Sequence, residues 1–160
     1  MLKKLLSSFI CFYAILFIFG LEKAYGDLNE SLYEKFYKHN TELANICQDV
    51  LGILETLRGN HAEFEVAEPI GTACNASRGH IQDTVRLFNI YYGVHNNNDR
   101  KRISPIMNDW IASMMREMET NGKYINKCLT MSHNYNVVLT GGRLKNKIVE
   151  INEDMKKIRF

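Results

Sequence analysis

Residues 104–129 read SPIMNDWIASMMREMETNGKYINKCL, and this stretch decides the fold. It opens with Ser104 and Pro105, a pair typical of a helix N-cap followed by the first helical position. Apolar side chains then recur at spacings of three and four, the period of one helical face. They are Met107, Trp110, Ile111, Met114, Met118, Ile125 and Cys128. A helix with this face must bury it against other helices.

Three further stretches show the same helical period. Residues 28–57, 69–92 and 143–159 each place leucine, isoleucine, valine, phenylalanine or methionine on one face and charged side chains mostly elsewhere. Four amphipathic helices with connections of moderate length favour antiparallel packing around one apolar core. The sequence therefore predicts an all-α fold, an antiparallel four-helix bundle with up-down-up-down topology.

The connections between these helices are less regular. Residues 60–68 and 96–103 are mostly polar, and we expect loops there. Residues 130–142 are ambiguous, because their β-branched centre fits either a short strand or the start of a helix that breaks at Gly141 and Gly142.

The N-terminus has the three parts of a secretory signal peptide, predicted to span residues 1–26. Lys3 and Lys4 give it a positive start, residues 5–20 are apolar or small, and small residues precede Asp27. The apolar run is short for a membrane span, although an uncleaved anchor is the alternative interpretation. We expect cleavage before Asp27 and a secreted or periplasmic location.

Signal removal changes the charge of the chain. The full sequence has 20 lysines and arginines and 18 acidic residues, and residues 27–160 keep 17 of each. A neutral mature chain has no net positive field, which argues against nucleic acid as a partner. No apolar run long enough to span a membrane remains, so we expect residues 27–160 to form a single helical domain with no integral membrane span.

Three cysteines follow the signal peptide, and an oxidising compartment favours at least one disulfide. With a helical rise of about 1.5 Å per residue, Cys74 lies at a height between Cys47 and Cys128 in an antiparallel bundle. We therefore favour a Cys47–Cys74 disulfide. Cys128 then stays free or joins another chain, which would give a homodimer, and a metal site at the three cysteines is a weaker alternative.

No catalytic, cofactor or metal motif is present. The sequence lacks a nucleophile elbow, a phosphate-binding glycine loop and a Glu-x-x-His pair, and its histidines form no recognised ligand spacing. These histidines are His39, His61, His80, His95 and His133. We predict no catalytic residue, no cofactor and no metal ligand, and hence no enzyme.

One exposed basic stretch suggests processing. Arg100, Lys101 and Arg102 lie in a predicted loop, where a secreted chain is open to proteases. Asp99 occupies a position where a furin-type protease would need arginine. The alternative is a solvated loop that only precedes a helix.

Two functional hypotheses follow. The first is a non-enzymatic secreted or periplasmic protein, accessory, effector or ligand-like, that binds a protein partner through a helix face. The second is a carrier that holds a small apolar ligand within the helical bundle. No single motif distinguishes them.

Overall fold

The computed structural model describes the backbone of residues 2–160 and the side chains of residues 30–160. The helices are α1 (Leu2–Leu57), α2 (His61–Gly93), α3 (Asn97–Met131) and α4 (Tyr135–Met155), and residues 2–160 contain no strand. The predicted all-α class is confirmed. The signal peptide at residues 1–26 lies outside the described side chains and stays a prediction.

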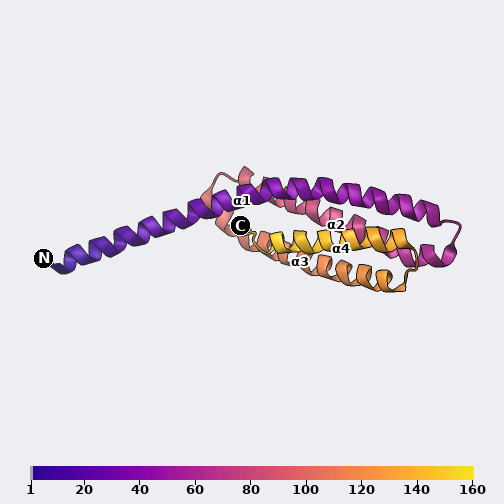
Figure 1. Ribbon diagram of the computed structural model, residues 1–160. Coiled ribbons are helices and arrows are strands. Elements are labelled where there is room, and N and C mark those ends of the chain that lie inside the picture. Colours follow the sequence, from indigo (N-terminus) through magenta and orange to yellow (C-terminus); the bar gives the residue numbers. More distant parts are fainter. Residues whose placement is uncertain (1) are drawn as a thin grey trace.

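The four helices form a closed ring of neighbours. Each helix packs against the next one in sequence, and α4 returns to pack against α1, whereas the described backbones of α1 and α3, on a diagonal, do not approach each other closely. Successive helices run in opposite directions, and the N-terminal half of α1 extends beyond the other three helices (Figure 1). This is the predicted up-down-up-down bundle.

The core is built from the apolar faces that the sequence predicts. Phe36, Ile81, Met118 and Ile151 come from the four different helices, and each is fully buried. Among the described residues, no helix is both long and apolar enough to cross a membrane.

Trp110 is a correction to this pattern. It was expected on the buried face of α3, but 59% of its surface is exposed. Met107 and Ile111 are both buried and already supply the inward-facing side chains at this level of α3. Trp110 follows Met107 by three residues and precedes Ile111 by one, which leaves it at the outer edge of the apolar face.

The loop predicted at residues 60–68 is wrong, because α2 begins at His61. The Asn60 side chain accepts a hydrogen bond from the backbone N–H of Glu63, which is a standard N-cap. Phe64 and Val66 pack partly against the core, so even this polar stretch has an inner face.

The loop predicted at residues 96–103 is also wrong. Asn96 caps α3 by accepting from the N–H of Asn98, and α3 begins at Asn97, seven residues before Ser104. Ser104 is not a cap, since its hydroxyl donates to the Arg100 carbonyl inside the helix.

Residues 130–142 contain no strand and no glycine break. They complete α3, turn at residues 132–134 and enter α4, where the Asn134 side chain accepts from the N–H groups of Asn136 and Val137. Gly141 lies against Leu129 and Ile70, and a Cβ added there would be 2.6 Å from the Leu129 side chain. The glycine therefore permits close packing of α4 instead of ending it.

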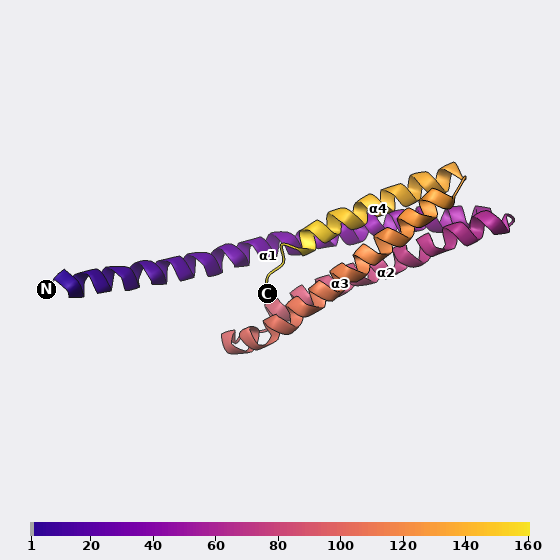
Figure 2. The ribbon, with the colours of Figure 1, turned by 90° about the horizontal axis from the view of Figure 1, so that it is seen from below.

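The C-terminal residues after α4 cross to the end of the α2–α3 hairpin (Figure 2). The Phe160 ring lies 5.2 Å from the rings of both Phe88 and Tyr91, measured between centroids. The Asn108 side chain accepts from the Phe160 N–H at 3.1 Å. This segment closes the end of the core beyond the short helix α4.

Candidate functional site

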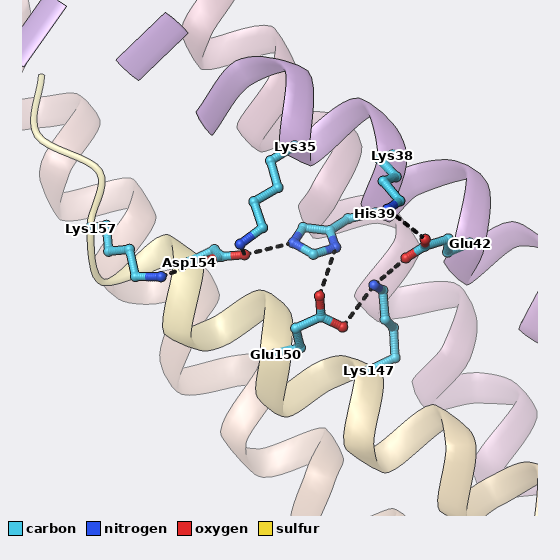
Figure 3. Close-up of polar contacts among 8 residues, drawn as sticks. All are labelled: Lys35, Lys38, His39, Glu42, Lys147, Glu150, Asp154 and Lys157. Carbon is cyan, nitrogen blue, oxygen red and sulfur yellow. Dashed lines mark hydrogen bonds and ion pairs between the residues drawn. The ribbon is translucent and has the colours of Figure 1, made fainter. Parts of the chain in front are cut away.

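Charged side chains gather where α1 packs against α4 (Figure 3). We call this group the α1–α4 polar cluster. It comprises Lys35, Lys38, His39 and Glu42 from α1, and Lys147, Glu150, Asp154 and Lys157 from α4 and the turn after it.

His39 and Asp154 form the centre of the cluster. Only 2% of each side chain is exposed, and His39 Nε2 lies 2.9 Å from Asp154 Oδ2. Lys35 Nζ contacts the same carboxylate oxygen at 2.7 Å, and Lys157 Nζ contacts the other at 2.7 Å. Burial acts to raise the pKa of Asp154, but hydrogen bonds from Lys157, Lys35 and His39 outweigh it and lower this pKa to about 2. Asp154 is therefore ionised at neutral pH.

The second ring nitrogen of His39 is different. Nδ1 is buried and has no hydrogen-bond partner among the described residues, and Glu150 Oε1 lies 4.0 Å away. Burial lowers the pKa of His39, and the charge of Lys147 acts in the same direction. At neutral pH the ring is neutral, with Nε2–H donating to the ionised Asp154 and Nδ1 carrying the lone pair.

Lys147 forms the second half of the cluster. Its side chain is 9% exposed, and its ammonium bridges Glu42 on α1 and Glu150 on α4, with 2.9 Å to Glu150 Oε2. Burial acts to lower the pKa of Lys147, but hydrogen bonds to Glu42 and Glu150 outweigh it and raise this pKa. The hydrogen bond from Lys147 lowers the pKa of Glu42. The two halves of the cluster therefore tie α1 to α4 over more than one helical turn.

The donor set fits a structural role better than a metal centre. His39, Glu150 and Asp154 each offer one ligand atom, and these atoms lie within 4.8 Å of one another. Both carboxylates are already paired with lysine ammonium groups, which would repel a cation. A structural zinc site needs four ligands without competing cations. No other such group of potential ligands occurs among the described residues.

The remaining histidines do not join this cluster. His80 Nε2 lies 3.1 Å from Glu117 on α3, and His61 Nδ1 lies 3.2 Å from Glu65 on its own helix. His95 and His133 lie near helix ends, and the cysteines are not among the possible metal ligand groups of the described residues.

The sequence did contain a signal for the buried pair. His39 follows Phe36 by three residues and precedes Leu43 by four, while Asp154 has the same spacing to Ile151 and Ile158. Each polar residue thus occupies a position that the apolar face would use. Two polar residues at such positions, on helices that pack together, are the pattern expected of a buried polar pair.

The predicted disulfide is confirmed. Cys47 and Cys74 are joined with an S–S distance of 2.07 Å and a Cα–Cα distance of 5.8 Å, and they link α1 to α2. Cys128 is a free thiol, 8% exposed, and burial raises its pKa. An intermolecular disulfide at Cys128 would require α3 to expose this side chain.

The basic stretch is helical and not a loop. Arg100, Lys101 and Arg102 lie in the first turns of α3, and the Arg100 guanidinium stands 5.3 Å from the centre of the Tyr91 ring. The Arg100 Nε–H also donates to the Val94 carbonyl. A helix held in this way is a poorer protease substrate than an open loop, so processing stays a prediction that the local structure makes less favourable.

Two surfaces of α3 are uncovered. On its outer side, two pairs of exposed apolar residues lie on one flank of the helix, four and seven residues apart within each pair and fourteen residues from one pair to the other, and we call them the α3 outer stripe. They are Ile106 (59% exposed), Trp110 (59%), Tyr124 (59%) and Met131 (53%). A stripe of this kind, with the only tryptophan of the sequence, is a candidate contact surface.

The second surface is a groove between α3 and α4 with a volume of about 430 Å³. Met118, Gly122 and Lys123 line it from α3, and Lys145, Ile148 and Val149 line it from α4. We call it the α3–α4 groove. A smaller, partly open pocket of about 10 Å³ lies at Val50, Ile70 and Gly141.

No model of a protein family, no curated protein and no solved structure matches this chain.

Proposed function

We propose that this chain is a non-enzymatic, secreted or periplasmic protein that binds a partner protein through the outer face of α3. The observation that carries the proposal is the α3 outer stripe, above all Trp110, of which 59% is exposed. Tryptophan and tyrosine are enriched among the residues that dominate binding energy at protein interfaces. A single exposed apolar residue needs no explanation, but Trp110 lies one helical turn from the equally exposed Ile106, and neighbouring exposed apolar side chains favour a contact surface.

Two features support an extracytoplasmic location. Residues 1–26 have the pattern of a signal peptide, and the Cys47–Cys74 disulfide fits an oxidising compartment. Sequencing the N-terminus of the natively produced protein tests this part of the proposal. We expect the chain to begin at Asp27, and a chain that begins at Met1 would contradict it.

A non-enzymatic role is supported by the chemistry of the α1–α4 polar cluster. Its carboxylates are paired with lysines, and its histidine has no serine or cysteine nucleophile among its contacts in the described chain. The buried thiol of Cys128 lies on α3, and burial raises its pKa, which is unfavourable for a nucleophile.

The partner surface can be tested with a matched pair of variants. Trp110→Ser alters the stripe, and Leu51→Ser alters an apolar side chain on α1 that is 50% exposed. Proteins captured from the native extracytoplasmic fraction should be lost with Trp110→Ser and retained with Leu51→Ser. Equal capture by both variants would contradict the proposal.

Trp110 also provides a direct optical readout. Because it is the only tryptophan, its emission should shift to the blue when a captured partner covers it. The same titration with Trp110→Phe gives the emission of the partner alone. An unchanged Trp110 emission in a verified complex would place the interface elsewhere.

The carrier hypothesis needs a different site. The pocket at Val50, Ile70 and Gly141 has a volume of about 10 Å³, which holds no more than one water molecule. The α3–α4 groove, by contrast, is large enough for a small ligand. A carrier role is therefore a second candidate, with the ligand on the outside of the bundle.

A further inference from the structure

We propose that the outer face of α4 binds a second copy of this chain, in a two-fold symmetric dimer whose axis passes at Gly142. This inference goes beyond the proposed partner binding and uses a different helix. It rests on an uncharged stripe along α4, on the symmetry of that stripe about Gly142, and on the charges at its two ends.

α4 is apolar on two sides. Its inner face enters the core, where Leu144, Ile148 and Ile151 are buried. On its outer face, residues 135, 139, 142, 146 and 149 recur at spacings of four and three, which is the period of one helical face. We call these residues, together with residue 138, the α4 outer stripe. They are Tyr135 (75% exposed), Val138 (40%), Leu139 (50%), Gly142, Asn146 and Val149 (53%).

This stripe differs from an ordinary exposed helix face. A surface helix normally places charged side chains on the side that faces away from the core. No residue of the α4 outer stripe is charged, and residues 128–142 contain no lysine, arginine, aspartate or glutamate. Tyr135 is the most exposed of the large apolar side chains among the described residues. An uncharged stripe of this length favours burial against another protein surface.

The stripe is symmetric about Gly142. Tyr135 and Val149 each lie seven residues from it, which corresponds to about 10 Å of helix. When two copies of α4 pack antiparallel about a two-fold axis at Gly142, each residue meets the residue equally far on the other side. Tyr135 then packs on Val149 of the second copy, and this contact occurs twice. Val149 also lines the α3–α4 groove, so the dimer and a ligand in the groove would compete.

The centre of the stripe permits this approach. Gly142 has no side chain, so the two helix backbones can come close at the axis. Leu139 lies three residues from Gly142, opposite Lys145 of the second copy. Lys145 Nζ donates to the Asn126 amide oxygen on α3 at 2.6 Å, so its charged end already has a partner. Its methylene chain can therefore cover Leu139 without an unpaired charge at the contact.

The charges at the ends of the stripe are complementary. Glu153 lies one turn beyond Val149, and its side chain is 58% exposed. Because it is eleven residues from Gly142, the antiparallel arrangement places it just beyond the N-terminus of α4 in the second copy. A helix N-terminus attracts negative charge, and α4 has no acidic residue in its own first turn. Each copy thus supplies the acidic group that the other lacks, although Glu153 also contacts Lys156 in its own chain.

The first test is sedimentation equilibrium of the natively produced protein. We expect a monomer–dimer equilibrium with a micromolar dissociation constant, because one pair of helices buries less than the standard interface area of about 1,600 Å². Cys128→Ala should keep this equilibrium, since the dimer needs no disulfide. A chain that stays monomeric at millimolar concentration, or a dimer that Cys128→Ala abolishes, would overturn the inference.

The second test places a charge at the axis. Gly142→Glu brings two carboxylates together and should raise the dissociation constant at least about tenfold, which corresponds to 1.4 kcal/mol. A Cβ at this position meets no atom within 4 Å, and glutamate favours a helix more than glycine does, so the monomer stays folded. Gly52→Glu is the matched control, because Gly52 is an exposed glycine within α1 and a Cβ there also meets no atom within 4 Å. A dimer that Gly142→Glu leaves intact would contradict the proposal.

The third test uses opposite charges to locate the axis. Gly142→Lys alone should also be monomeric, whereas an equimolar mixture of Gly142→Lys and Gly142→Glu should form a heterodimer, because opposite charges then meet at the axis. Native mass spectrometry distinguishes the heterodimer from either homodimer. A mixture that stays monomeric would overturn the axis at Gly142.

The fourth test addresses the apolar contact and the alternative occupant. Tyr135→Ser should raise the dissociation constant about tenfold, whereas Tyr37→Ser, at a tyrosine of α1 that is 52% exposed, should leave it unchanged. Binding to phospholipid vesicles by a chain that never dimerises would overturn the inference if Tyr135→Ser abolishes it. Trp110→Ser should leave the dimer intact, since Trp110 lies on α3. Failure of the dimer and failure of the α3 outer stripe can thus be distinguished.

Discussion

α1 is held to its two neighbours by different chemistry. Against α2, the Cys47–Cys74 disulfide is joined by aromatic contacts, with the Tyr33 ring 5.9 Å from the Phe88 ring between centroids. Against α4, the contact includes the α1–α4 polar cluster around His39 and Asp154. The α1–α2 interface depends on a covalent bond and on apolar packing. The α1–α4 interface depends in addition on which of its side chains are ionised.

The difference predicts two separate sensitivities. Reduction should weaken the α1–α2 interface at any pH near neutrality, because it breaks a bond and changes no charge within the core. Acid should weaken the α1–α4 interface, because His39 and Asp154 both have lowered pKa values. Each test variant below acts on one of these interfaces, and each control acts on neither.

Removal of the disulfide should have the largest effect. Cys47→Ala combined with Cys74→Ala should lower the free energy of unfolding by about 2–5 kcal/mol, since the unfolded chain regains the entropy of the opened loop. Urea denaturation at pH 7 and at pH 6 measures this, and the loss should be similar at both. Cys128→Ala is the control, and a double variant as stable as that control would contradict the prediction.

Loss of the central carboxylate should have the next largest effect. Asp154→Ala leaves the Nε2–H of His39 buried without an acceptor, which destabilises the fold by about 1–3 kcal/mol. Glu153→Ala is the matched control, because its carboxylate pairs with Lys156 at the surface and only about 0–1 kcal/mol is expected. Equal losses of unfolding free energy for the two variants in urea denaturation would show that the buried pair stabilises the fold no more than a surface pair does.

The pH dependence should come from the same residues. Because the pKa of folded His39 lies below its unfolded value of about 6.5, its contribution to stability is present above pH 6.5 and is lost as the pH falls. Asp154 contributes above its unfolded pKa of about 4, and this part is lost as the pH falls from there toward 2.

His39→Gln separates these two contributions, since glutamine donates a hydrogen bond but does not titrate. Measured by urea denaturation, the variant should lose the decline in stability just below pH 6.5 and keep the decline below pH 4. A variant with the full profile of the unaltered protein would show that another group causes the decline near pH 6.

The smallest effect is expected at an exposed ion pair of the same two helices. Arg143 on α4 donates to Asp49 on α1 at 2.9 Å, but both side chains are about half exposed, at 54% and 51%. Arg143→Ala should change the free energy of unfolding by about 0–1 kcal/mol, and added salt should reduce the difference further. A loss of unfolding free energy as large as that of Asp154→Ala would contradict the prediction that a buried pair stabilises the fold more than an exposed pair.

The fold was predictable where the apolar period was unbroken. The faces around Phe36, Ile81 and Ile151 gave the helices and their packing, and helix rise gave the disulfide. The helix ends were not predictable from composition, because residues 60–68 are stabilised by a cap at Asn60 and by partial burial of Phe64. Polar composition indicates exposure, and exposed residues can still be helical.

The candidate site was less predictable. Each residue of the His39–Asp154 pair interrupts an apolar face, but nothing in the sequence says that the two interruptions meet across α1 and α4. The exposure of Trp110 was missed for a related reason. Apolar residues three and four apart mark one side of a helix, and only the packing of the neighbours decides which edge of that side stays uncovered.

The α1–α4 polar cluster holds α1 to α4, and we propose that it has this structural role alone. NMR titration of the His39 ring, with and without Zn²⁺, tests this most directly. We expect a His39 pKa below 6.5 and resonances that Zn²⁺ leaves unchanged. A pKa above 6.5 would show that the contact with Asp154 outweighs burial, and a stoichiometric shift with Zn²⁺ that Glu150→Gln abolishes would instead make the cluster a metal site.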